Sequence, residues 1–254
     1  SAEGAALRII DFVRTNSTVI DIGGHLGRFA EAVQILGGKP QNILIFEPVH
    51  LLHLCQIQRL GHALNSDGGN LYEFFNFALG SEDNKVDTIL MSPDKWTASA
   101  LPAGWNTLYG VDPNLDGPDS DLPNWREKMG SEPILIRTLS RVLTGLAPSR
   151  YHDVSVIKID AEGYEGEVLR GTLPFLRYVA HDPDRILPVM IIETAWGIDR
   201  HPDGEENLKT YHELVDLGYC PTPLLREETV DVLWVPIDVD PSCSKHKILE
   251  GGRL

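Results

Sequence analysis

The sequence predicts an α/β fold built on a mostly parallel β-sheet with helices on both faces. Short β-rich runs alternate with amphipathic stretches along most of the chain. The first of these runs, Thr18-Val-Ile-Asp-Ile22, breaks into a glycine-rich turn before a helix begins. Near the C-terminus, two β-rich runs flank residues 226–229 in the pattern of an antiparallel hairpin.

The predicted elements follow one another in a regular order. Helices are expected over residues 4–14 and 27–36, the second ended by the stop signal Gly37-Gly38. Further helices are expected after Glu47 and near Gly163. The predicted parallel strands cover residues 18–22, 42–46, 72–78, 154–159 and 189–192, the run 86–91 is expected to add to the sheet, and the hairpin covers 219–225 and 230–235.

Residues 92–132 interrupt this alternation of predicted strands and helices. The segment is rich in Pro, Gly, Asp and Asn, and Trp96, Trp105, Tyr109 and Trp125 are interleaved with them. Loops of this length are usually functional or disordered, and aromatic residues are scarce in plain disorder. We therefore predict one domain over residues 1–254 with an inserted lid, in which Trp96 and Trp105 contact the substrate. A well-packed surface excursion is the alternative.

Composition narrows the class of protein. The formal net charge of −15 disfavours a surface that follows nucleic-acid phosphates. No apolar run approaches the roughly 20 residues of a membrane span, so no membrane association is expected. The three cysteines, Cys55, Cys220 and Cys243, form no CxxC pair. The simplest interpretation is a reduced chain in the cytoplasm.

The turn after the first strand predicts a nucleotide-type cofactor. Gly23, Gly24 and Gly27 leave bare backbone for a ligand, but their spacing does not match GxGxxG, the dinucleotide fingerprint. Asp21 lies inside the strand end, where a carboxylate suits a ligand with an ammonium group and hydroxyls. S-adenosylmethionine carries both. His25 could reach the cofactor carboxylate or act as a base, and a turn-stabilising hydrogen bond is its alternative role.

Carboxylates end three other strands, where ligands of doubly wound sheets bind. Glu47 follows the second strand and could accept hydrogen bonds from two ribose hydroxyls, or could favour the dipole of the next helix. Asp160 and Glu162 follow the fourth strand, beside the expected position of the methyl acceptor, with Lys158 as a charge partner. Glu193 ends the fifth strand and could orient the substrate. It could also complete a metal site with Asp160, but no metal is assigned.

Taken together, these residues resemble the FkbM family of S-adenosylmethionine-dependent methyltransferases over roughly residues 17–235. The most specific match is the run Lys158-Ile-Asp-Ala-Glu-Gly-Tyr-Glu165. Other matching stretches are Val19-Ile-Asp-Ile-Gly-Gly-His-Leu-Gly-Arg-Phe29, Ile45-Phe-Glu-Pro-Val49, Phe77-Ala-Leu-Gly80, Ile136-Arg-Thr-Leu139 and Ile191-Ile-Glu193. This family often has Ala-Asn where the present turn has Gly24-His25.

The resemblance implies a Rossmann-like class I methyltransferase fold, a seven-stranded, mostly parallel sheet that ends in an antiparallel hairpin. It also implies S-adenosylmethionine as cofactor. Asp21, Gly23 and Gly27 would hold the methionine end and Glu47 the ribose. Asn76, Phe77 and Ala78 would lie beside the adenine.

Members of this family are mostly O-methyltransferases of secondary metabolites, sugars or glycans, so a hydroxyl on a small molecule is the expected acceptor. Asp160 or Glu162 would orient that hydroxyl or take its proton, with His25 as another base. Two alternatives remain, a noncatalytic partner subunit on the same scaffold and an NAD-dependent oxidoreductase. The oligomeric state does not follow from the sequence.

Overall fold

The computed structural model describes residues 2–91, 130–146, 153–161, 163–193, 204–225 and 230–240. Trp96, Trp105 and Glu162, for which the sequence predicts roles in the site, lie outside these ranges. The prediction of a single domain with an inserted lid therefore stays a prediction.

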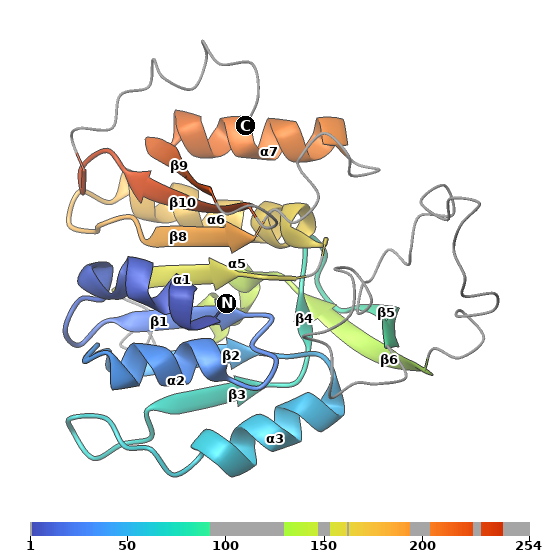
Figure 1. The fold of residues 1–254 in the computed structure, drawn as a ribbon. Coiled ribbons are helices and arrows are strands. Elements are labelled where there is room, and N and C mark those ends of the chain that lie inside the picture. Colours follow the sequence, from blue (N-terminus) through green and yellow to red (C-terminus); the bar gives the residue numbers. More distant parts are fainter. Residues whose placement is uncertain are drawn as a thin grey trace.

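A seven-stranded sheet forms the centre of the described part of the chain, with the strand order β3-β2-β1-β7-β8-β10-β9 (Figure 1). The first five strands in this order are parallel, and β10 runs antiparallel to both of its neighbours, β8 and β9. The predicted sheet and terminal hairpin are thus confirmed. The strands are β1 (Thr18–Ile22), β2 (Asn42–Phe46), β3 (Tyr72–Phe75), β7 (Val154–Ile159), β8 (Val189–Glu193), β9 (Tyr219–Leu225) and β10 (Val230–Pro236).

The central strands are buried on both faces because helices cover both sides of the sheet. Alternate residues of β1 enter different cores, with Val19 in one and Ile20 in the other. The first core takes side chains from α1 and α2, and the second from α5, α6 and α7. The helices are α1 (Ala2–Ile9), α2 (Arg28–Ile35), α3 (His50–Leu60), α5 (Leu139–Gly145), α6 (Glu165–His181) and α7 (Gly204–Asp216), with the 3-10 helix η1 (Ile10–Phe12) after α1. In this part of the chain, no helix is both long and apolar enough to cross a bilayer.

A second sheet, with the order β4-β6-β5, lies beyond the carboxyl ends of the parallel strands (Figure 1). It contains β4 (Ala78–Leu79), β5 (Lys85–Met91) and β6 (Gly130–Arg137). One prediction was wrong here. Residues 86–91 do not join the main sheet, because β5 pairs with β6 along its whole length. The last residues of the predicted insertion, 130–132, belong to β6.

The predicted strand over 72–78 also breaks in two. β3 pairs with β2 as far as Phe75, and the amide of Glu47 then donates to the carbonyl of Phe75. The next amide on this side of β2 is that of Val49, which donates to the Glu47 carboxylate at 2.9 Å and not to the strand. The chain therefore leaves the main sheet and enters β4.

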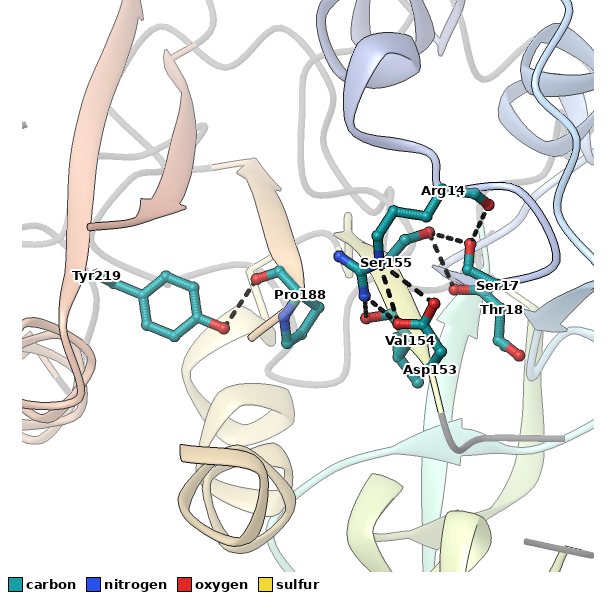
Figure 2. A network of polar contacts seen from close by, with 8 residues as sticks. All are labelled: Arg14, Ser17, Thr18, Asp153, Val154, Ser155, Pro188 and Tyr219. Atoms are coloured by element: carbon teal, nitrogen blue, oxygen red, sulfur yellow. Dashed lines mark hydrogen bonds and ion pairs between the residues drawn. The ribbon is translucent and has the colours of Figure 1, made fainter. Parts of the chain in front are cut away.

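The amino-terminal edge of the main sheet is held by a polar network (Figure 2). The Arg14 guanidinium forms an ion pair with Asp153 and donates to the carbonyl of Val154, 2.9 Å away. The Ser17 and Ser155 hydroxyls are 2.6 Å apart, just before β1 and inside β7. Farther along the sheet, the Tyr219 hydroxyl donates to the carbonyl of Pro188 at 2.8 Å. These contacts fasten the starts of the strands.

The cysteines differ from the sequence prediction of a reduced chain. Cys55, on α3, carries a free thiol. Cys220, on β9, is disulfide-bonded. The prediction was therefore wrong for Cys220.

Candidate active site

The glycine turn lies directly against the end of β7. Gly23 has a φ of 74°, in the left-handed region that favours glycine. A Cβ atom at this position would lie only 1.7 Å from the carbonyl oxygen of Asp160. Gly24, beside it, leaves space that the Ile45 and Gln56 side chains fill, and Gly27 begins α2 with a φ of 73°. Gly23 therefore lets the ends of β1 and β7 meet, and Gly24 and Gly27 leave room for side chains of β2 and α3.

His25 is held in the turn by its backbone. Its φ of 47° is unusual for a residue with a side chain. Its amide donates to Oε2 of Glu47 at 2.8 Å, and its carbonyl accepts from Nε2 of Gln56 at 2.7 Å. The imidazole Nε2 is buried without a hydrogen-bond partner in the described residues. Because burial lowers the pKa of His25, the imidazole is neutral near pH 7.

Glu47 connects the end of β2 to the glycine turn. Its second oxygen accepts from the amide of Val49 at 2.9 Å, and the residue is only 5% exposed. Burial raises its pKa to about 7. Nδ2 of Asn76 donates to the carbonyls of Glu47 and Pro48, at 3.0 and 2.9 Å. Asn76 thus fixes the backbone that carries the carboxylate.

Lys158 is the cation at the centre of the site. Its Nζ lies 2.9 Å from Oδ2 of Asp160, 3.4 Å from Oδ1 of Asp21 and 3.3 Å from the carbonyl of Gly23. Burial alone would lower the pKa of Lys158, but the carboxylates of Asp160 and Asp21 outweigh it and raise that pKa. Lys158 therefore stays charged, in the role of charge partner that the sequence predicts.

The two aspartates beside Lys158 differ in their surroundings. Asp21 is fully buried, and apart from the long contact of Oδ1 with the Lys158 ammonium, at 3.4 Å, neither of its oxygens has a close hydrogen-bond donor in the described residues. Burial raises its pKa. The Asp160 side chain is partly exposed, at 31%. Burial would raise the pKa of Asp160, but the Lys158 ammonium outweighs it, and a hydrogen bond with Glu193 lowers that pKa further. Glu193 comes from β8, the strand next to β7.

Glu165 stabilises the turn that follows Asp160. Its Oε1 accepts from the amides of Ala161 and Gly163, at 2.9 and 3.1 Å. Burial raises the pKa of Glu165 to about 7. Neither Glu165 nor Gln56 is a site residue in the prediction from the sequence. Gln56 could have been found from the sequence, because it is a polar residue on the buried face of a predicted helix.

The predicted adenine stretch falls partly beside the site. Asn76 contacts the backbone of Glu47. The centroid of the Phe77 ring lies 5.6 Å from that of Phe46 and 5.7 Å from that of Phe75. Ala78 is buried in β4. The structure thus brings Asp21, the glycine turn, Glu47, Asp160 and Glu193 together at one edge of the sheet, with Asn76 and Phe77 next to them. In the described ranges, no group of three His, Cys, Asp or Glu side chains is arranged to hold a metal ion.

These residues fit S-adenosylmethionine. Asp21 offers a buried carboxylate that has only a long contact with Lys158, at 3.4 Å, in the described residues, so it can accept a ligand ammonium group. Each oxygen of Glu47 accepts one backbone amide and has a lone pair left for a ribose hydroxyl. The glycine turn leaves bare backbone between Asp21 and Glu47.

The strand order, the glycine turn and the acid after β2 define a Rossmann-like methyltransferase fold of class I. The chain belongs to the FkbM methyltransferase family, because residues 21–216 match the methyltransferase FkbM domain. Membership of this family makes S-adenosylmethionine the cofactor, as the sequence predicted.

Three solved structures similar to this chain are methyltransferases. The FkbM methyltransferase of Methylobacillus flagellatus KT is 13% identical, with a TM-score of 0.50 over 87% of this chain and 44% of that one. The present chain thus spans less than half of that protein. A SAM-dependent methyltransferase from Aquifex aeolicus is 13% identical, with a TM-score of 0.42 over 91% of this chain and 88% of that one. An O-methyltransferase from Bacillus cereus, solved in complex with SAH, is 9% identical, with a TM-score of 0.46 over 92% of this chain and 80% of that one. No curated protein sequence matches significantly.

Proposed function

We propose that the protein transfers the methyl group of S-adenosylmethionine to a hydroxyl of a small metabolite, sugar or natural product. The observation that carries this proposal is the pairing at the ends of β1 and β7. There Asp160, which Lys158 keeps ionised, lies beside a turn that presents an unpartnered imidazole nitrogen. The acidic chain, with a net charge of −15, supports a small acceptor rather than a nucleic acid.

The cofactor supplies an electrophilic methyl group on a sulfonium sulfur. In the proposed arrangement Asp21 and the glycine turn hold its amino-acid end and Glu47 holds the ribose hydroxyls. Asn76 keeps the Glu47 backbone in place, and Phe77 lies next to it. These residues bind and align, and alignment of the two reactants supplies much of the rate enhancement of a bimolecular reaction.

Asp160 and His25 have different roles toward the acceptor, the first in orienting its hydroxyl and the second in removing its proton. Lys158 lowers the proton affinity of Asp160, so this carboxylate accepts a hydrogen bond from the acceptor hydroxyl and orients it. His25 is neutral and its Nε2 is free in the described structure, so it takes the hydroxyl proton as the oxygen gains the methyl group. Glu193 supports Asp160 from the neighbouring strand.

Calorimetry with S-adenosylhomocysteine, S-adenosylmethionine and NAD tests the proposal. We expect saturable binding of the first two and none of NAD. A protein that bound NAD alone would be an oxidoreductase, and absence of binding to both sulfur compounds would overturn the proposal. Methyl transfer to a panel of small hydroxyl acceptors, read by mass spectrometry, then separates an enzyme from a noncatalytic subunit.

A further inference from the structure

Arg137, the last residue of β6, has a donor without an acceptor. Its guanidinium carbon lies 5.2 Å from the centroid of the Phe77 ring. Its Nε is buried and has no hydrogen-bond partner in the described residues. A guanidinium is always charged, and a buried donor without an acceptor costs free energy. Such a donor is expected where a ligand supplies the missing acceptor.

Two carboxylates in and next to the small sheet accept hydrogen bonds from groups other than Arg137. Oε1 of Glu132, on the same strand, accepts from the amide of His50 at 2.9 Å. Oδ1 of Asp83 accepts from the amide and hydroxyl of Thr138, at 2.9 and 3.1 Å. Throughout the part of the chain that the structure describes, no ion pair joins Arg137 to a carboxylate. Arg170 and Arg177, by contrast, each pair with a glutamate.

The position of Arg137 connects it to the candidate active site. The Arg137 guanidinium lies over the ring of Phe77. That ring packs against the rings of Phe46 and Phe75. Phe46 directly precedes Glu47, and Phe75 ends β3. Arg137 therefore stands where the small sheet meets the carboxyl-terminal edge of the main sheet.

We propose that Arg137, supported by the Phe77 ring, binds a carboxylate or phosphate group carried by the methyl acceptor. The inference rests on the proposed function, because it assigns the chemical class of the acceptor at the same site. A guanidinium matches both anions with two parallel donors, and the ring beneath it fixes the plane of the fork. Lys158 is occupied by two aspartates, so it does not compete for the anion.

Nuclear magnetic resonance of the arginine Nε–H groups tests this site. Inorganic phosphate and acetate are titrated separately into the wild type, Arg137→Met and Arg141→Met. Arg141 is the matched control, since it is an exposed arginine on α5 and its loss changes the charge equally. We expect one Nε–H signal, absent from Arg137→Met, to shift saturably, and the tighter anion identifies the group. Affinity should fall about tenfold or more in Arg137→Met. It should stay within about twofold in Arg141→Met.

Absence of a saturable shift with either anion overturns the proposal, and so does an equal loss of affinity in Arg141→Met. Repeating the phosphate titration with S-adenosylhomocysteine bound separates the two ligands. Phosphate that still binds supports an acceptor site, whereas displacement assigns Arg137 to the cofactor and overturns the proposal. Failure of the proposed function appears separately, as a wild type that does not bind S-adenosylhomocysteine.

Discussion

Glu47 and Asp160 are carboxylates of one site whose pKa values move in opposite directions. Glu47 has backbone amides as partners and no ion pair with any described residue, so burial raises its pKa to about 7. Asp160 has the Lys158 ammonium at 2.9 Å, and its pKa is lowered. Around neutral pH, the state of Glu47 therefore changes while Asp160 stays ionised.

This difference predicts that cofactor affinity depends on pH through Glu47. The ionised carboxylate accepts the ribose hydroxyls, so affinity for S-adenosylhomocysteine should rise as pH increases through about 7. In Glu47→Gln, affinity should fall about tenfold or more and lose this rise. Calorimetry between pH 6 and 8 measures both effects, and Glu205→Gln, on the exposed start of α7, is the control. An unchanged pH profile in Glu47→Gln would contradict the assignment.

Glu47→Gln should also change how the free energy of unfolding depends on pH. The pKa of Glu47 is raised on folding from 4.5, so its contribution to stability is present below 4.5 and is lost as pH rises through about 7. The free energy of unfolding of the wild type should therefore fall relative to Glu47→Gln over this range, by at most about 3 kcal/mol. Urea denaturation at pH 5 and pH 8 measures the difference.

His25→Asn separates catalysis from binding. Asparagine tolerates the left-handed backbone of this position but removes the imidazole. We expect affinity for S-adenosylhomocysteine to persist, and turnover to fall by about 10²–10⁴. Because the pKa of His25 is lowered, wild-type turnover should decline with acid only below pH 6.5, and the variant should lack that limb. His62→Asn, at an exposed position, is the control. Full turnover in His25→Asn would exclude it as the base.

Helices and strands could be predicted from the sequence where a local pattern of residues determines them. Apolar runs with clear ends gave β1 and β2 residue for residue, and the hairpin to within one residue. The small sheet was missed because its partners are far apart in the chain. Strand β6 begins with Gly-Ser-Glu-Pro, a loop-like composition, and its pairing with β5 is visible only in three dimensions.

The candidate site shows the same division. The residues at strand ends were predictable because parallel strands bring their carboxyl ends to one edge. Gln56 acts on the backbone of His25, 31 residues away, and its sequence position does not identify that partner. Glu165 accepts from backbone amides within four residues, but its role depends on the conformation of the turn after Asp160. The lowered proton affinity of Asp160 likewise depends on the distance to Lys158.

The junction of β1 and β7 predicts that Gly23→Ala is far more damaging than Gly37→Ala. Both glycines have positive φ, so both variants bear the strain of a left-handed alanine, about 1–2 kcal/mol. Only at Gly23 would the new Cβ strike backbone, 1.7 Å from the Asp160 carbonyl, whereas nothing lies within 4 Å at Gly37. Gly23→Ala should lose at least about 2 kcal/mol more by urea denaturation. It should also lose S-adenosylhomocysteine binding, and equal stabilities would contradict the geometry.

For the whole molecule, the cysteines predict a labelling pattern. Alkylation in denaturant without reductant should modify Cys55 and leave Cys220 unmodified, because Cys220 is disulfide-bonded. After reduction, both should be modified, as peptide mass spectrometry can show. Structural disulfides seldom persist in a reducing compartment. The protein isolated from its native cells therefore also tests the predicted cytoplasmic location, and alkylation of Cys220 there would support it.

The polar network at the start of the strands has a consequence for combining substitutions. β1 is five residues long, which places Ser155 and its partners about 15 Å from the glycine turn. Effects of changes this far apart generally add within about 0.5 kcal/mol. Ser155→Ala should therefore lower the free energy of unfolding by about 1 kcal/mol, in the wild type and in Glu47→Gln alike. Substitutions at the amino-terminal edge of the sheet should thus cost stability alone, whereas substitutions at the opposite edge should also impair the proposed methyl transfer.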